Sequence, residues 1–179
     1  MAEDTEIAPD TKDWTWVLTR PCPECGHDSR SVAGPDIGAR TRAGAAAWQQ
    51  VLARPGARER PAGGAWSPAE YGCHVRDVFE VFDRRLQLML AQDDPALQNW
   101  DQDATAVERR YAEQDPAVVG PELAAAAEVI AARFDAVSGD QWGRTARRSD
   151  GAVFTVETLG QYFVHDWVHH LHDVGAPLP

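Results

Sequence analysis

Four of the six histidines in this chain fall within eight residues, from His165 to His172. In an α-helix, residues i and i+4 lie about 40° apart around the axis and about 6 Å apart along it. His165 and His169 would therefore present two imidazoles side by side, at the spacing that a divalent metal ion needs. His172 falls on the same stripe, whereas His170 is expected to turn away as a surface or packing residue.

His74 is the candidate for a third ligand. It belongs to an apolar stripe with Val78 and Phe82, so its side chain should face the core. Taken alone, it would be a buried neutral histidine bonded to a carbonyl group. Together with His165 and His169 on another helix, it matches the way in which helical bundles build metal sites. Three protein ligands and a free fourth position are typical of catalytic zinc, on which water or a thiol loses its proton near neutral pH.

Long amphipathic helices must position these histidines. The second helix has the clearest start, because Ser67 is a suitable N-cap, Pro68 suits the first turn and Glu70 completes a capping box. Gly175 is expected to end the last helix. Strand patterns are absent or short. The apolar spacing predicts four helices, at about residues 36–53, 67–91, 116 (or 121)–137 and 155–175.

Loop length predicts how these helices are connected. Residues 92–115 form a loop much longer than antiparallel neighbours need, so the second and third helices should be parallel. We therefore expect an all-α fold, a four-helix bundle in up-down-down-up order, over residues 36–175. Residues 1–35 would form an irregular extension that carries a CxxC turn and is acidic and disordered over residues 1–13. Residues 176–179 would be a short tail.

The bulk composition narrows the function. A chain of 179 residues with 44% hydrophobic residues fits one compact domain. A net charge of −11 argues against nucleic acid as a partner. No apolar run is long enough for a membrane span, and no secretion signal is evident. An odd number of cysteines, three, favours a reducing cytoplasm.

The residues around His74 and the last helix resemble a known family. Tyr71-Gly-Cys-His74-Val-Arg-Asp77, with His165-Asp-Trp-Val-His169-His170, is similar to the DinB-like (YfiT-like) superfamily over roughly residues 36–175. That superfamily includes mycothiol-dependent maleylpyruvate isomerases and bacterial thiol S-transferases. The resemblance implies an up-down-down-up bundle with zinc or nickel on His74, His165 and His169. In the isomerase branch one ligand is a glutamate, and histidine at both positions of the pair counts against the isomerase reaction.

The resemblance implies an enzyme that activates a low-molecular-weight thiol on the metal for attack on a small electrophile. Mycothiol is the expected thiol, because the resemblance includes mycothiol-dependent enzymes and the coding bias suggests an actinobacterium-like source. That bias is GC-rich, since Lys12 is the one lysine among many arginines. A metal-dependent hydrolase is the alternative on the same site. A stress-related binding or interaction protein is the alternative of another class, and histidines bonded in the core without metal are a third. The expected partners are the thiol and the electrophile, and a homodimer is compatible with the sequence.

Three acidic residues and one histidine lie near the expected ligands in the sequence, and Asp77 and His172 are the candidates for supporting them. Asp77, one turn after His74, would accept its imidazole N–H, or else lie at a solvent edge of the helix or pair with Arg76 or Arg84. Asp166 and Asp173 are expected to be solvated carboxylates that point off the histidine face. His172 would be either a polar group of the site or a satisfied residue at the helix end.

Two further segments could contact ligands. Trp100, within residues 99–103 of the long loop, would either fold over the site or simply anchor the loop. Arg144 and Arg147, clustered with Arg148, would hold carboxylates of a thiol cofactor or substrate, or else form an exposed basic loop.

The segment Cys22-Pro-Glu-Cys25-Gly-His27 looks like half of a zinc ribbon. Cys73, next to His74 on a helix, points about 100° away from it. Cys22, Cys25 and His27 would hold a second zinc if one more ligand joined them. A redox-active pair and a tight turn with free thiols are the alternatives.

Overall fold

The structure is a computed structural model that describes residues 13–179. The predicted disorder of residues 1–13 therefore lies almost wholly outside the described residues. Long helices dominate, as expected, and the third begins at the earlier of its two predicted starts. Their bounds are α1 Ile37–Leu52, α2 Pro68–Ala91, α4 Pro116–Asp135 and α5 Val156–Asp173.

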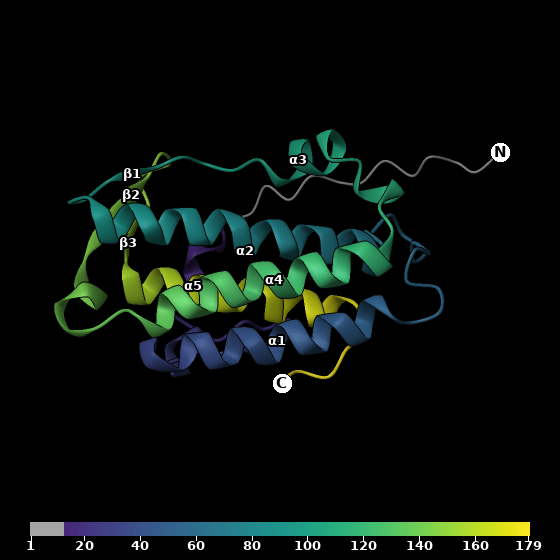
Figure 1. The fold of residues 1–179 in the computed structure, drawn as a ribbon, viewed down its shortest axis with the longest axis horizontal. Coiled ribbons are helices and arrows are strands. Elements are labelled where there is room, and N and C mark those ends of the chain that lie inside the picture. The colour runs from purple at the N-terminus through teal and green to yellow at the C-terminus, as the bar shows by residue number, and fades with distance from the viewer. Residues whose placement is uncertain (1–12) are drawn as a thin grey trace.

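The four long helices form a bundle in up-down-down-up order, which confirms the predicted fold class. Figure 1 shows α1 and α5 running in one direction and α2 and α4 in the other. The main contacts join α4 to α1 and α2, and join α5 to the same two helices, so α1 and α2 lie diagonally opposite each other. The last helix, which carries the histidines, thus packs directly against α2, which carries His74.

The crossover between α2 and α4 contains structure that the periodicity did not indicate. It holds strand β1 (Ala96–Leu97), helix α3 (Gln102–Glu108) and a 3-10 turn (Tyr111–Glu113). Helix α3 buries none of its residues, so it carries no apolar stripe. Strand β1 pairs in parallel with β2 (Thr145–Arg148), which pairs antiparallel with β3 (Val153–Thr155).

The N-terminal segment lies against α5. It contains 3-10 helices at Trp14–Leu18, Ser29–Ser31 and Gly34–Asp36, and all three contact α5. Two hydrogen bonds join the segment to that helix. Gly34 N donates to Glu157 Oε1 at 3.2 Å, and Gln161 Nε2 donates to the carbonyl of Val32 at 3.0 Å.

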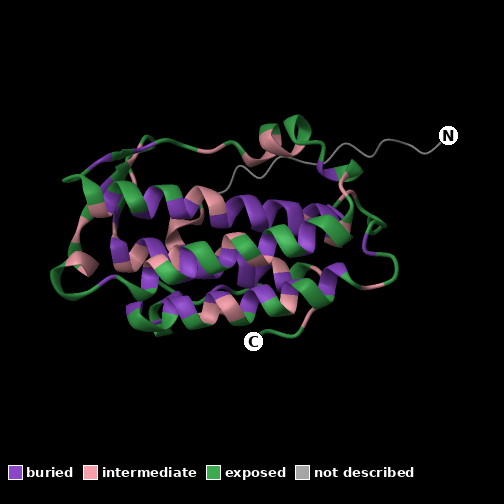
Figure 2. Ribbon diagram, in the orientation of Figure 1, coloured by how far each residue is buried: buried purple, intermediate pink, exposed green. Residues whose placement is uncertain are grey.

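The core fills the space between the inner helix faces, which are buried while the outer faces are exposed (Figure 2). Close helix packing depends on small residues. A Cβ on Gly44 of α1 would lie 2.5 Å from the ring of Trp167 in α5, and a Cβ on Gly160 of α5 would lie 2.3 Å from Ile37. Glycine at both positions therefore lets α1 and α5 approach each other.

The second helix begins as predicted. Glu70 N donates to Ser67 Oγ at 3.2 Å, and Ser67 N donates to Glu70 Oε2 at 2.8 Å, so the capping box is formed. The guanidinium of Arg60 also binds the Glu70 carboxylate. Burial works to raise the pKa of Glu70, but the bonds from Arg60 and Ser67 outweigh it and lower that pKa.

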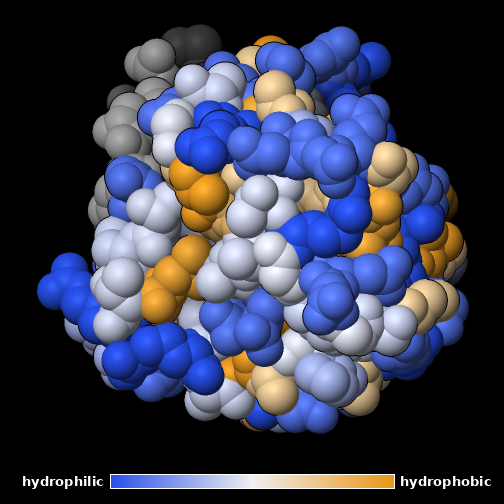
Figure 3. Space-filling model, turned by 90° about the vertical axis from the view of Figure 1, so that its left-hand side faces the viewer, coloured by the Kyte–Doolittle hydropathy of each residue, from blue (hydrophilic) through white to orange (hydrophobic). Residues whose placement is uncertain are grey.

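The surface carries scattered rather than continuous apolar groups. On the end of the bundle seen in Figure 3, hydrophobic residues lie in small patches separated by hydrophilic ones. Within residues 13–179, no helix has the length and apolarity of a membrane span.

Candidate metal centre

Helix α5 presents two interleaved pairs of metal-ligating side chains. His165 and His169 form one i, i+4 pair, and Asp166 with His170 forms another, offset by one residue. One residue of offset turns a side chain by about 100° around a helix. The two pairs therefore face different neighbours, and the structure gives each pair a different set of partners.

Asp166 and His170 meet His74 of α2. One ligand atom from each of these residues lies within 4.8 Å of the other two. His74 Nε2 lies 3.3 Å from Asp166 Oδ1, and His170 Nε2 lies 3.8 Å from the same oxygen. The three side chains thus converge from two adjacent helices, which is how a bundle builds a metal site.

The polar atoms of this cluster fit a metal ion. His74 is fully buried, and neither of its ring nitrogens has a hydrogen bond of normal geometry within the described part of the chain. Asp166 Oδ1 is likewise buried without a hydrogen bond. Buried polar atoms without hydrogen bonds are costly, and a cation between His74 and Asp166 would satisfy both. Two imidazoles and one carboxylate are a known ligand set for catalytic zinc.

The charge state of this cluster favours binding of a cation. Burial works to raise the pKa of Asp166, but the neighbouring His74 and His170 lower it to about 2, so the group is a carboxylate at neutral pH. Nδ1 of His170 lies 2.8 Å from Asp173 Oδ2. Such a carboxylate partner orients a ligating imidazole and leaves its other nitrogen for the metal.

A cleft of about 860 Å³ borders the cluster. Asp166 and His170 lie in its wall, so a ligand in the cleft could reach a metal held there. Trp100 from the crossover also lies in the wall and stacks on His74, with ring centroids 5.4 Å apart and an angle of 11°. Residues 99–103 were expected either to fold over the site or to anchor the loop, and the structure places Trp100 of this segment against His74.

Two arginines, Arg85 and Arg148, contribute positive charge to a cleft that several carboxylates also line, among them Asp150, which pairs with Arg148. Arg85 of α2 is buried, donates to the carbonyl of Gln98 at 3.0 Å, and has its pKa lowered by burial to about 10, so it remains charged at neutral pH. Arg148 of β2 lies over the rings of Phe154 and Tyr162. Guanidinium groups in such a wall can bind a carboxylate or another anionic group of a ligand.

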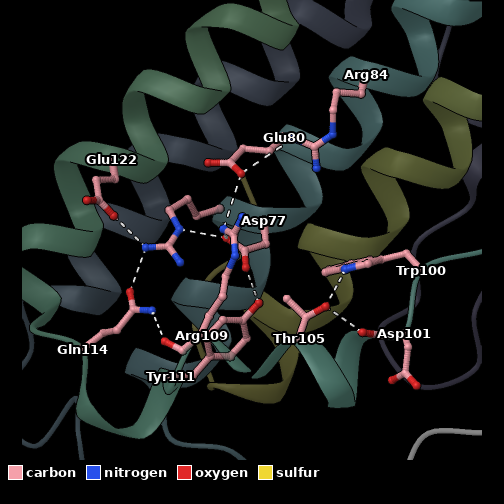
Figure 4. A network of polar contacts seen from close by, with 11 residues as sticks. Asp77, Glu80, Arg84, Trp100, Asp101, Thr105, Arg109, Tyr111, Gln114 and Glu122 are labelled. Carbon is pink, nitrogen blue, oxygen red and sulfur yellow. Dashed lines mark hydrogen bonds and ion pairs between the residues drawn. The ribbon is translucent and has the colours of Figure 1, made fainter. Parts of the chain in front are cut away.

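A polar network fastens the crossover that carries Trp100 (Figure 4). Its centre is Asp77, whose carboxylate accepts from Arg76 Nε at 2.9 Å, from Arg109 at 2.7 Å and from the Tyr111 hydroxyl. Burial, together with this bond to Asp77, raises the pKa of Tyr111. Asp77 therefore joins α2 to the crossover, and of its two expected partnerships the structure contains the ion pair with Arg76.

His165 and His169 meet the N-terminal segment instead of α2. Cys25 Sγ lies 3.8 Å from His165 Nε2, and Cys22 Sγ lies 3.7 Å from His169 Nδ1. Burial, followed by the neighbouring His169, lowers the pKa of His165 to about 4, so this imidazole is neutral at pH 7. Burial raises the pKa of the Cys25 thiol to about 11, which makes it a weak nucleophile in the absence of a metal.

The structure thus divides the expected ligands between two clusters. His74 belongs to one cluster, whereas His165 and His169 belong to the other. Asp166 and His170 were not predicted as partners of His74, because the spacing of His165 and His169 suits a metal equally well and does not reveal which stripe of α5 faces α2. The Asp-x-x-x-His spacing was the available signal.

The remaining candidates lie apart from the first cluster. Arg144 donates to the carbonyls of Met89 and Gln92 at the end of α2, and Arg147 pairs with Asp94. Within the described residues, the arginines that line the cleft are Arg148 and Arg85, not these two.

Two of the other histidines have different surroundings. His172 is half exposed beside Asp173. His27 has a buried Nε2 without a hydrogen bond among the described residues, and its ring centroid lies 6.2 Å from that of His165. His27 is not part of the second cluster, in which the ligand atoms of Cys22, Cys25, His165 and His169 converge. The two cysteines therefore meet His165 and His169 instead of the expected His27.

Comparisons with known proteins agree with this architecture. The family model described as the DinB superfamily matches residues 37–174. A solved structure of YfiT from Bacillus subtilis, described as a probable metal-dependent hydrolase with an unusual four-helix bundle topology, is similar with a TM-score of 0.70 and 20% identity. That match covers 79% of this chain and 86% of YfiT. No curated protein matches the chain significantly.

Proposed function

The chain belongs to the DinB superfamily, and on that premise we propose that it is a metal-dependent enzyme whose ion is held by His74, Asp166 and His170. The observation that carries the proposal is the convergence of these three side chains beside a large cleft. Three protein ligands next to open space are typical of a catalytic centre, whereas structural zinc sites close with four. When bound, the ion would lower the pKa of a coordinated thiol or water.

We propose a thiol as the activated group, and the cleft has room and polar side chains for one. Its volume, about 860 Å³, is at the upper end of the range for small-molecule sites, so it has room for a polar thiol together with an electrophile. Carboxylates and amides suited to a hydroxyl-rich thiol such as mycothiol line it, including Asn99, Asp101 and Gln102. In the proposed transfer the thiol sulfur bonds to carbon, the bond from that carbon to its leaving group breaks, and the thiol proton passes to solvent.

The surrounding residues would orient the reactants. Trp100 covers His74 and keeps water from that side of the cluster. Arg85 and Arg148 would hold an anionic group of either reactant. Asp166 also supplies a carboxylate at one position of the pair on the last helix, where the isomerase branch has a glutamate, so the difference there is one of side-chain length rather than of ligand type.

A hydrolase is the second candidate. YfiT, the similar solved structure, is described as a probable metal-dependent hydrolase. Two histidines and a carboxylate also serve metalloproteases that activate water. The two candidates share the centre and differ in the nucleophile.

One assay separates these candidates. Metal-loaded protein is incubated with mycothiol and a bimane electrophile, and thiol consumption and conjugate fluorescence are followed. A transferase consumes the thiol, and His74→Ala abolishes the reaction, while the exposed control His172→Ala retains it. Cleavage of ester or amide substrates without thiol consumption would favour the hydrolase. Stable metal binding with neither reaction would favour the non-enzymatic binding protein.

A further inference from the structure

We propose that Cys22, Cys25, His165 and His169 form a second metal site, a closed Cys2His2 zinc site that fastens the N-terminal segment to α5. One ligand atom from each of these four residues lies within 4.8 Å of the other three. The site shares no ligand with the proposed catalytic centre. The inference therefore does not depend on the proposed function.

The spacing of the donor atoms suits tetrahedral zinc. With Zn–S of about 2.3 Å and Zn–N of about 2.0 Å, a tetrahedral angle separates sulfur from nitrogen by about 3.5–3.6 Å. In the structure, Cys22 Sγ lies 3.7 Å from His169 Nδ1, and Cys25 Sγ lies 3.8 Å from His165 Nε2. Each thiol thus already lies close to the distance from its imidazole that a shared ion would impose.

A tight turn points both sulfurs to the same side. Cys22 N donates to the carbonyl of His27, and Gly26 N donates to the carbonyl of Cys22, each at 2.9 Å. Gly26 has a φ of +75°, a conformation that glycine adopts without strain. The opposite half of the site needs no special backbone, because residues four apart on α5 share one face.

The environment is that of a structural site. All four side chains are buried, and each belongs to a class of ligand that zinc prefers. Two thiolates would balance the charge of a divalent ion, so the complete site would be neutral, which suits burial. Four protein ligands leave no position for substrate.

Outer contacts complete the second site. Nε2 of His169, the nitrogen that faces away from Cys22, lies 3.5 Å from Glu24 Oε2 and 3.7 Å from Asp173 Oδ1. Carboxylates in this position orient a ligating imidazole. Trp14 covers both rings, with centroids 5.7 Å from His165 and 4.9 Å from His169.

The site has a consequence for the cleft. Trp14, which precedes the CxxC turn, and Glu24, which lies within it, line the same cleft as Asp166 and His170. A metal that holds the turn on α5 would therefore shape one wall of that cleft. The second ion would therefore stabilise the shape of the cleft and would not contact the reacting atoms.

Cobalt spectroscopy tests the proposal directly on the full-length protein. The metal is stripped under reducing conditions and Co²⁺ is added back. A thiolate-to-cobalt charge-transfer band is expected from the Cys2His2 site, whereas the cluster of His74, Asp166 and His170 has no sulfur ligand. Absence of this band in the wild-type protein would overturn the proposal, and this measurement needs no variant to fold.

Variants identify the ligands. Cys22→Ser and His169→Ala should each reduce the bound metal by one ion and weaken or abolish the thiolate band. Two controls should leave the bound metal and the thiolate band unchanged. They are Cys73→Ser, which removes a buried cysteine outside both clusters, and His27→Gln. A band that survives in His165→Ala/His169→Ala but is lost in His27→Gln would place the site on other ligands and refute the proposal.

The two proposals fail in different ways. Loss of the first centre in His74→Ala should abolish the reaction and keep the thiolate band. If the band is present but no reaction is found, the proposed function is wrong and the second site stands. A Cys22–Cys25 disulfide in anaerobically purified protein, with no sulfur-bound metal, would reject the second site alone.

Discussion

At the scale of single residues, one step along α5 decides which ligands meet. His165 and Asp166 are neighbours in the sequence, yet one lies beside Cys25 and the other beside His74. The same division separates His169 from His170. A helix can thus serve two metal clusters with consecutive residues, because adjacent side chains diverge by about 100°.

Removing the carboxylate of the cluster of His74, Asp166 and His170 should impair that cluster and leave the Cys2His2 site intact. We expect Asp166→Asn to weaken metal binding at His74 and His170 and to reduce the rate of the proposed reaction by about 100-fold or more, since the ligand charge is lost. Metal analysis and the bimane assay measure both effects. The thiolate band should persist, and full activity in this variant would contradict the assigned ligand set.

Asp173 should strengthen metal binding at the cluster of His74, Asp166 and His170 without being a ligand itself. Its Oδ2 lies 2.8 Å from His170 Nδ1 and so holds the ring in place. Replacement of such a partner weakens metal affinity by about 10–100-fold, and we expect a loss in this range for Asp173→Asn. Competition with a chelator gives the affinity. Asp140→Asn, on an exposed 3-10 turn, is the control.

At the scale of elements, the close approach of α1 to α5 should be sensitive to a single methyl group. We expect Gly44→Ala to destabilise the protein by about 1–3 kcal/mol, because its Cβ would lie 2.5 Å from Trp167. Gly120→Ala on α4 is the matched control. Its Cβ would be 3.8 Å from Leu52, so the better helix propensity of alanine should leave stability unchanged or raise it by up to about 1 kcal/mol. Denaturant unfolding compares them.

The start of α2 should make stability depend on pH. Because the folded state lowers the pKa of Glu70, its contribution is present above the unfolded value near 4.5 and is lost as the pH falls through the folded value. Glu70→Gln should cost about 1 kcal/mol at pH 7 and progressively less in acid. Unfolding titrations across this range check the sign. Glu113→Gln, in an exposed pair with Arg110, should have little effect at any pH.

At the scale of the whole molecule, the second metal would cross-link distant parts of the chain. Cys22 and His169 are separated by 147 positions. A cross-link that closes a long loop stabilises a protein by about 2–4 kcal/mol. We therefore expect Cys22→Ser to lower Tm by roughly 10 °C. Calorimetry measures this, and hydrogen exchange should increase mainly in residues 13–36. Unchanged Tm and exchange would mean that the segment is held without metal.

The arrangement of the helices was largely predictable from local signals. The capping residues around Ser67 marked the start of α2 because side-chain bonds to backbone N–H groups are local. The length of the loop after α2 indicated that α2 and α4 are parallel, because a crossover must span the bundle. Helix α3 escaped prediction, since a short exposed helix leaves no apolar period to detect.

The sequence by itself determined the four long helices, their up-down-down-up order, and the presence of metal-ligating side chains on α2, on α5 and in the CxxC turn. Tertiary structure alone decided which of these ligands meet. The reason is geometric: the rotation of α5 about its axis depends on how Trp167, Phe163 and their neighbours pack in the core. That rotation turns Asp166 and His170 toward His74. It also places His165 and His169 against the CxxC turn, which lies about 140 residues earlier in the sequence.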